Sequence, residues 1–351
     1  MDRLPHDPTT LLPPPDQEPA AGDDAAQARR ALQAALWECK RVVVGQDAML
    51  ERVLVALLTG GHVLLEGVPG LAKTLTVRTL AGVLGGSFGR VQFTPDLVPA
   101  DLVGTRIWRP DTGEFKTELG PVFANLLLAD EINRAPAKVQ SALLEVMQEH
   151  QVTIGGNTYR VPDPFLVLAT QNPIESEGTY ALPEAQVDRF LFKLVVDYPA
   201  LEDEIAVARG MAGAGATTTR EVLQPTDLIR YRRAAAAVHV DRDVATYAVH
   251  LVDATRHPER RGLEEITGLI AFGASPRASI GLLQSARALA LLRGRGHVTN
   301  ADVHDLARDV LRHRLVLSYD ALADGVRPDE ILDRVLDVVA PVGHVPLAEA
   351  A

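Results

Sequence analysis

Five short runs of apolar residues recur along the first 200 residues, and segments of helical periodicity separate most of them. The runs are HVLLE (62–66), RVQF (90–93), ANLLLA (124–129), FLVLAT (165–170) and FKLVV (192–196). Runs of this length that are apolar throughout are typical of parallel strands buried on both faces. Their alternation with helices predicts an α/β domain built on a parallel sheet.

The strand pattern stops at Pro199, and the remaining apolar spacing is helical. The helices expected there begin at Leu201, Pro225, Asp243, Ser275 and Asn300. We therefore place a boundary near residue 199, between an α/β domain (26–198) and a helical domain with a C-terminal segment (199–351). Two further helices are expected before the first strand. Residues 1–25 are rich in Pro and Asp without apolar periodicity, which predicts a disordered tail.

The composition limits the classes of protein to which this chain can belong. The chain has 351 residues, 47% of them apolar, which is enough for two ordinary domains. It shows no apolar run of about 20 residues and no signal-peptide pattern, so we expect no membrane insertion. A single cysteine, Cys39, favours a reducing cytoplasm. The net charge of −11 argues against a protein that binds nucleic acid by bulk electrostatics.

The segment Gly67–Thr74, GVPGLAKT, fits the phosphate-loop pattern G-x-x-x-x-G-K-[ST] except that Ala72 replaces the second Gly. It lies between a predicted strand and a predicted helix, where such a loop has to be. Lys73 can reach the β- and γ-phosphates of ATP, and Thr74 can hold Mg²⁺. Because Ala72 lies where the helix begins, we expect a negative φ there and a tolerated methyl group. The alternative is a loop that contains Lys-Thr by chance.

Two acids and an amide follow neighbouring predicted strands. Asp130 and Glu131 end the run LLLADE, and Asn172 follows FLVLATQ. Ligands bind beyond the carboxyl ends of parallel strands, so these side chains are expected in one crevice with the phosphate loop. Asp130 would hold Mg²⁺ through its waters, Glu131 would polarise the attacking water, and Asn172 would orient that water. The alternatives are an acidic helix start, with Pro136 in its first turn, and a turn Asn before Pro.

The order of these motifs resembles the MoxR family of AAA+ ATPases, in the clade with a helix-2 insert and a pre-sensor-1 hairpin. The resemblance rests on GVPGLAKT, LLLADEINRAP, ATQNPIESEGTYALPEAQVDRFLF and SPRA, and it runs from about Val43 to at least Val316. The family typically has Ala at the position of Ala72. The resemblance implies a P-loop NTPase AAA+ core with a parallel sheet, followed by an all-α lid domain.

The resemblance also implies roles for single residues. Arg189, in DRF, matches the arginine finger, and Arg277, in SPRA, matches sensor 2. Gly45 and Gln46 would lie near adenine, although core packing would also explain their apolar neighbours Val42–Val44. A surface arginine linked to an acid is the alternative for Arg189. The nucleotide contacts expected are Gly45, Gln46, Gly67, Val68, Pro69, Gly70, Leu71, Ala72, Lys73, Thr74 and Leu75.

Two insertions contain hairpin signals. Strand-like pieces TRIWRP and EFKTELG flank the turn 111–113, and QVTIGGNTYRV (151–161) has two alternating runs around Gly155-Gly156-Asn157. In a ring of subunits both hairpins would face the axial opening. The second hairpin carries only one basic residue, Arg160, which weighs against a motor that moves on DNA.

By this resemblance the chain is an ATP- and Mg²⁺-dependent ATPase that assembles into a hexameric ring and remodels or activates a client protein. A protein with a von Willebrand A-type domain is the expected partner, and nucleic acid is not expected. A metal-chelatase-type motor is the alternative, and a DNA helicase or translocase is a more distant one. The string GAFTGA of AAA+ transcription activators is absent. A scaffold that only binds nucleotide would lack the acid pair, which is present.

Overall fold

The computed structural model describes residues 21–68, 70–173, 179–213 and 219–341. Its centre is a parallel sheet of five strands in the order β2-β5-β8-β1-β9. The strands are β1 (Val63–Glu66), β2 (Phe88–Gln92), β5 (Leu126–Asp130), β8 (Leu166–Gln171) and β9 (Phe192–Val195). The predicted parallel sheet is confirmed, with β2 starting two residues before the expected run.

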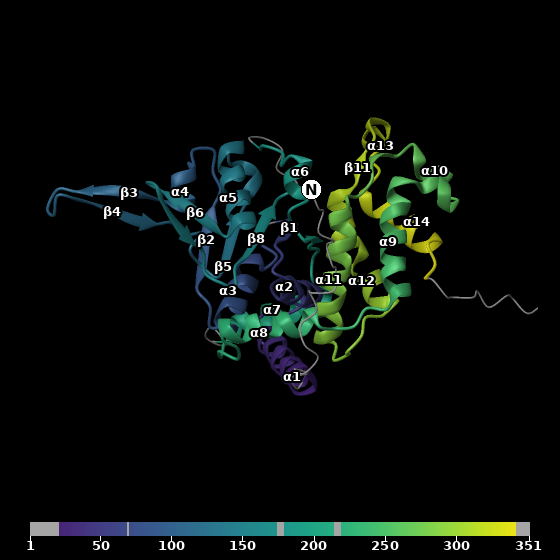
Figure 1. Ribbon diagram of the computed structural model, residues 1–351, viewed down its shortest axis with the longest axis horizontal. Coiled ribbons are helices and arrows are strands. Elements are labelled where there is room, and N and C mark those ends of the chain that lie inside the picture. Colours follow the sequence, from purple (N-terminus) through teal and green to yellow (C-terminus); the bar gives the residue numbers. More distant parts are fainter. Residues whose placement is uncertain (1–20, 69, 174–178, 214–218, 342–351) are drawn as a thin grey trace, which may run out of the picture.

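Both faces of the sheet are buried, as the apolar strands require. Along β5, Leu126 and Leu128 pack into a cluster with α3 (Lys73–Val83), and Leu127 packs into a second cluster with α5 (Ala137–Glu149). Figure 1 shows the helices on the two sides of the sheet. Because every strand is parallel, the carboxyl ends of all five lie at one edge.

The chain after residue 199 is mainly helical, as expected. Its helices are α7 (Leu201–Gly213), α8 (Pro225–Ala236), α9 (Arg242–Arg256), α10 (Glu264–Thr267), α11 (Pro276–Leu292), α12 (Asn300–Leu311), α13 (Tyr319–Ala323) and α14 (Pro328–Val338). The expectation of an all-α domain needs one correction. Two short antiparallel strands, β10 (Ile270–Phe272) and β11 (Val316–Leu317), pair across the helical part. Runs of two or three residues are too short to show a period of two in the sequence.

The N-terminal helix begins earlier than expected. Helix α1 spans Ala21–Lys40, so residues 21–25, which we had assigned to the disordered tail, are helical. Asp24 in its first turn favours this start, because an acid stabilises the positive end of the helix dipole. Residues 1–20 of the expected tail lie outside the described residues.

Both predicted hairpins are present. Strands β3 (Gly104–Arg109) and β4 (Glu114–Leu119) follow the short helix α4 (Pro99–Val103) and extend away from the body of the molecule at the left of Figure 1. Strands β6 (Gln151–Ile154) and β7 (Asn157–Arg160) are joined by Gly155 and Gly156. Both glycines have positive φ, 57° and 88°, which suits the tight turn of a two-residue hairpin.

The two hairpins contact each other. The hydroxyl of Tyr159 in β7 donates to Oγ1 of Thr117 in β4 at 3.1 Å. The Arg106 guanidinium of β3 lies 4.9 Å from the centre of the Phe115 ring, and Gly155 of the second hairpin lies directly beside the Arg106 side chain. The protruding hairpin thus packs against the smaller one.

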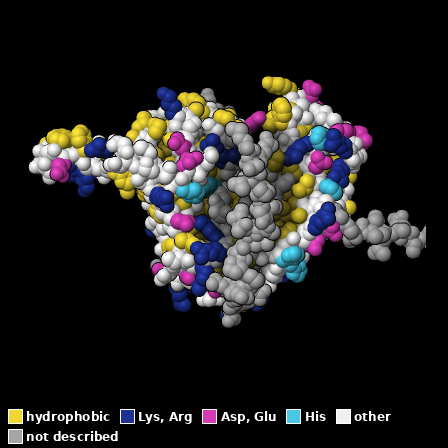
Figure 2. Space-filling view, in the orientation of Figure 1, with side chains coloured by type: hydrophobic (Ala, Val, Ile, Leu, Met, Phe, Trp, Pro, Cys, Tyr) yellow, Lys and Arg dark blue, Asp and Glu magenta, His cyan; other side chains and the backbone are white. Residues whose placement is uncertain are grey.

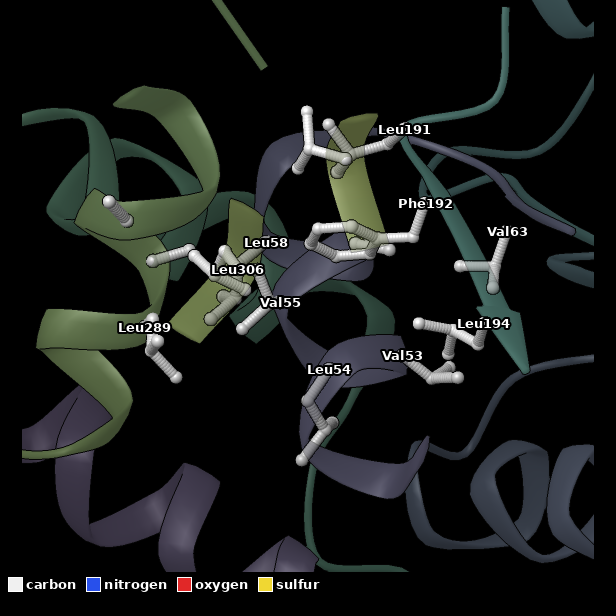
Figure 3. Close-up of a cluster of buried hydrophobic side chains, with 14 of the residues drawn as sticks. Val53, Leu54, Val55, Leu58, Val63, Leu191, Phe192, Leu194, Leu289 and Leu306 are labelled. Carbon is white, nitrogen blue, oxygen red and sulfur yellow. The ribbon is translucent and has the colours of Figure 1, made fainter. Parts of the chain in front are cut away.

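The α/β part and the helical part share one hydrophobic core. Helix α2 (Asp47–Thr59) lies between the sheet and α11, and Figure 3 shows its Leu58 close to Phe192 of β9 and Leu306 of α12. Polar contacts join the same elements, because the buried Arg52 guanidinium lies 2.8 Å from Asp305 and 2.9 Å from Asp309. The two parts therefore form one packed unit.

Replacing Phe192 with Ala is expected to lower the free energy of unfolding by about 3–5 kcal/mol, because the fully buried ring leaves a cavity between β9 and α2. The matched control is Val195→Ala on the same strand, where the residue is 53% exposed. We expect the control to change stability by about 0.5 kcal/mol or less. Urea unfolding followed by circular dichroism measures both, and equal losses in the two variants would contradict the packing described.

Candidate functional site

The segment between β1 and α3 lies at the carboxyl edge of the sheet. Together with the ends of β2, β5 and β8 it surrounds a cavity of ≈ 430 Å³. The lining residues are Gly67, Gly70, Leu71, Ala72, Lys73, Thr74, Leu75, Arg90, Gln92, Asp130, Glu131, Thr170, Gln171 and Asn172. The expected phosphate loop, acid pair and Asn172 are thus brought together in one cavity.

The backbone of Ala72 differs from our expectation. The residue precedes the first helical residue, Lys73, and has a left-handed conformation with φ 54° and ψ 16°. The chain has to turn sharply from the loop into α3, and this residue makes the turn. Its carbonyl then accepts the Thr76 amide at 2.8 Å and the Thr76 hydroxyl at 3.0 Å. A Cβ in this region costs about 1–2 kcal/mol, so the second Gly of the general pattern has a conformational reason.

Lys73 is held inside the cavity. Its ammonium group donates to the carbonyl oxygen of Gly67, at the start of the same loop. Burial lowers the pKa of Lys73, while Asp130, Glu66 and Glu131 act against that shift. A cation placed under a loop of backbone amides at a helix start is the arrangement that binds phosphate groups.

Asp130 is held through both carboxylate oxygens. The Thr170 hydroxyl donates to Oδ1 at 2.7 Å, and the Arg90 guanidinium donates to Oδ2 at 2.7 Å. The Thr170 oxygen in turn accepts the backbone amide of Glu131 at 2.9 Å. One hydroxyl of β8 therefore holds the carboxylate of Asp130 and the backbone of Glu131.

Glu131 leaves the strand with a left-handed backbone, φ 57°. This turn sends its carboxylate toward β2, where Oε2 accepts Nε2 of Gln92 at 2.9 Å. The same oxygen accepts an N–H of Arg134, also at 2.9 Å, from the short 3₁₀ helix Ile132–Arg134. The Glu131 carboxylate is thus held between two donors, one from β2 and one from the 3₁₀ helix.

Other expected contacts lie outside the cavity lining. Val68 flanks the loop, and Pro69 falls outside the described residues. Gly45, with φ 75°, packs against Pro199 and Asp203 at the start of α7, and Gln46 precedes α2. Contact of Gly45 and Gln46 with adenine stays a prediction.

The donor set fits a magnesium ion that a nucleotide brings with it. Thr74 and Asp130 supply hard oxygen ligands to the same cavity. Within the described part of the chain, no group of three or more His, Cys, Asp or Glu side chains could hold a metal by itself. This is the pattern of Mg²⁺ held by one or two protein groups, waters and phosphate oxygens.

Arg189 and Arg277 do not line the phosphate cavity. They line a separate cavity of ≈ 290 Å³ that shares no residue with it. Arg277 is the second residue of α11, and its guanidinium lies 3.6 Å from the Asp188 carboxylate. The negative charge of Asp188 offsets the unfavourable position of an arginine at a helix N-terminus. The Arg189 side chain is exposed and makes no hydrogen bond or ion pair with any described residue. The two arginines are therefore presented together, on a face apart from the nucleotide loop.

The segment 188–191 is held by a residue that sequence reasoning missed. The buried Arg314 guanidinium donates to the Asp188 carboxylate at 2.7 Å and to the carbonyl of Phe190 at 2.7 Å. Ser275, the residue before α11, also donates to Asp188 at 3.1 Å. Burial lowers the pKa of Arg314, and the Asp188 carboxylate opposes that effect.

Four residues of the phosphate cavity were also missed, namely Arg90, Gln92, Thr170 and Gln171. A signal was available for the first two. They alternate with the buried Val91 along β2, and this alternation is the pattern of a strand with one polar, accessible face. Thr170 carried no signal, because threonine is an ordinary strand residue.

The chain matches known families and proteins over most of its length. Residues 62–192 match the ATPase family associated with various cellular activities (AAA), and residues 265–335 match the AAA lid domain. Chaperone MoxR1 of Mycobacterium tuberculosis is 56% identical over 328 residues, which cover 93% of this chain and 87% of that protein. Protein MoxR of Paracoccus denitrificans is 37% identical over 79% of this chain and 86% of its own length.

A solved structure has the same fold. The crystal structure of a protein from Cytophaga hutchinsonii superposes with a TM-score of 0.87 at 46% identity, over 92% of this chain and 98% of that one. In the described ranges, none of the helices has the length and apolar character needed to span a bilayer. The sequence identity, the matched core and lid and the shared fold agree with the motifs in the cavity. The chain belongs to the MoxR family of AAA ATPases.

Proposed function

We propose that the chain hydrolyses ATP with Mg²⁺ in the cavity at the carboxyl edge of the sheet. The observation that carries the proposal is the meeting of Lys73, Thr74, Asp130 and Glu131 in one cavity. Lys73 and the loop amides bind the phosphates, and Thr74 and Asp130 hold the metal, which neutralises charge on the transferred group. Glu131 accepts the proton of the attacking water, and Asn172 orients that water.

We also propose that the chain works as a ring, which we take to be a hexamer. In one subunit, Arg189 and Arg277 lie in their own cavity apart from the phosphate loop. An arginine that stabilises charge on the γ-phosphate has to reach it, so these residues would serve the nucleotide of a neighbouring subunit. Arg189, which has no partner among the described residues, is the finger, and Arg277 is its companion.

The work done by the ring is proposed to be the remodelling or activation of a client protein. The β3–β4 hairpin carries four large apolar side chains that are exposed. These residues are Ile107, Trp108, Phe115 and Leu119. Figure 2 shows hydrophobic side chains gathered on the protruding arm at the left. Exposed apolar residues on a projecting arm suit contact with a polypeptide. The name Chaperone MoxR1 of one relative agrees with this class of activity.

The proposed partner and the chelatase alternative are supported by fewer observations than the ATPase site. A protein with a von Willebrand A-type domain is proposed as the partner by family analogy alone. A metal-chelatase-type motor would use the same cavity and the same hairpins. What separates the two proposals is the client, so capture of bound proteins by a ring stalled with Glu131→Gln is the experiment that distinguishes them.

A helicase is not favoured by the charge of the hairpins. Arg106, Arg109 and Lys116 on the long hairpin are balanced by Asp111, Glu114 and Glu118, and Arg109 pairs with Glu118. The short hairpin has one basic residue, Arg160. A groove that follows a phosphate backbone would need an excess of basic residues.

Lys73→Ala is expected to abolish ATP binding, because the charge that faces the phosphates is removed. Glu131→Gln is expected to keep binding and to lower the rate of hydrolysis by about 10²–10⁴-fold, the range for a lost general base. Nucleotide titration and phosphate release measure both, with Lys138→Ala on the exposed face of α5 as the control. Hydrolysis at the parental rate by the Glu131→Gln variant would overturn its role.

Mixed rings test whether Arg189 acts on a neighbour. Lys73→Ala subunits bind no ATP but still present Arg189, whereas Arg189→Ala subunits bind ATP and present no finger. Mixing the two inactive proteins should restore hydrolysis at interfaces that combine an intact loop with an intact finger, with a maximum at intermediate ratios. Native mass spectrometry confirms that mixed rings form. Background hydrolysis in mixed rings at every ratio would remove the support for a trans-acting finger.

DNA and RNA are expected not to stimulate ATP hydrolysis at physiological salt, because the two hairpins together have only one basic residue, Arg160, in excess of their acids. Hydrolysis is measured with and without single- and double-stranded DNA and with RNA, over a range of salt concentrations. Stimulation of several-fold that falls steeply with salt would favour the helicase instead.

A further inference from the structure

Arg90 occupies the side of the Asp130 carboxylate on which a bound metal ion would lie. Its guanidinium lies 2.7 Å from Oδ2 of Asp130, while Thr170 holds the other carboxylate oxygen. The two oxygens of Asp130 are thus both engaged within the chain. Arg90 and Asp130 line the cavity that contains Lys73 and Thr74.

The sheet places Arg90 there for a simple reason. In the parallel pairing of β2 with β5, Arg90 is the partner of Leu128 and Gln92 is the partner of Asp130. Arg90 and Leu128 therefore share the face of the sheet that α3 covers, and the long side chain reaches forward to the end of β5. Arg90 also donates to Oε1 of Gln92 at 3.2 Å, which keeps it aligned along the strand.

A guanidinium and a divalent cation cannot both be close to one carboxylate oxygen without strong repulsion. Binding of a magnesium nucleotide through Asp130 therefore requires this ion pair to open. The Arg90 side chain is 48% exposed, so the pair contributes little to stability and opens at low cost. The Thr170 hydroxyl does not compete with the metal. It is a neutral donor and it bonds Oδ1, so Oδ2 can face the metal and its waters.

We propose that Arg90 is a built-in counter-ion that competes with Mg²⁺ for Asp130. In the nucleotide-free chain it neutralises the carboxylate, and on binding of the magnesium nucleotide it is released from it. Arg90 thereby reduces the gain in nucleotide affinity that Mg²⁺ causes. This inference rests on the proposed function, since it assigns a positioning residue to the same nucleotide site.

The test compares how strongly Mg²⁺ affects ADP binding, which avoids hydrolysis. Calorimetric titration of the full chain with ADP gives one Kd with Mg²⁺ and one with EDTA. The Kd with EDTA divided by the Kd with Mg²⁺ measures how much the metal strengthens ADP binding. Arg90→Gln should raise this ratio by about three- to fivefold, the size of a partly exposed ion pair. Arg90→Lys keeps the positive charge and should stay within about twofold of the parent chain.

The matched control is Arg109→Gln, which removes an arginine of similar exposure paired with Glu118 on the β3–β4 hairpin, outside the cavity, and should leave the ratio unchanged. Thermal unfolding without nucleotide confirms that every variant is folded. An unchanged or lower ratio for Arg90→Gln would overturn the competition. If Arg90→Gln weakens ADP binding equally with Mg²⁺ and with EDTA, Arg90 is a phosphate contact instead. Failure of the parent chain to bind ADP at all would refute the proposed function itself.

Discussion

The whole architecture depends on burying both faces of a parallel sheet. Strands such as β5 and β8 carry apolar residues at successive positions, and these fill two separate clusters beneath and above the sheet. Polar side chains have no place along such strands, so they collect where the strands end. The same-direction pairing then gathers those ends at one edge, which is why the chemistry of the chain lies in a single cavity.

Local features were predictable from the sequence because each is encoded within a few residues. The strands, the phosphate loop and the acids Asp130 and Glu131 follow from apolar runs and from residues that directly adjoin them. Both hairpins followed from turn residues such as Gly155 and Gly156. The conformation of Ala72 was missed although the Gly of the general pattern at this position indicated a positive φ, because alanine itself has no preference for that region.

Features that depend on distant segments were missed. The partner of Asp130 is Arg90, forty residues earlier, and only the order of β2 beside β5 brings them together. The position of Arg277 beside Asp188 likewise depends on how the helical part packs on the sheet. Strands β10 and β11 lie some forty-five residues apart in the sequence, and neither is long enough to have a pattern of its own. Tertiary packing decided each of these outcomes.

Arg314 couples the helical part of the chain to the segment that contains Arg189. It follows α12 in the helical part, yet it donates to the carbonyls of Asp188, Phe190 and Leu191 in the segment that leads into β9. Because Asp188 also accepts from Ser275 at the start of α11, the helical part holds the residue next to Arg189 from two sides. If the helical part tilted against the sheet, the exposed Arg189 would therefore move with it.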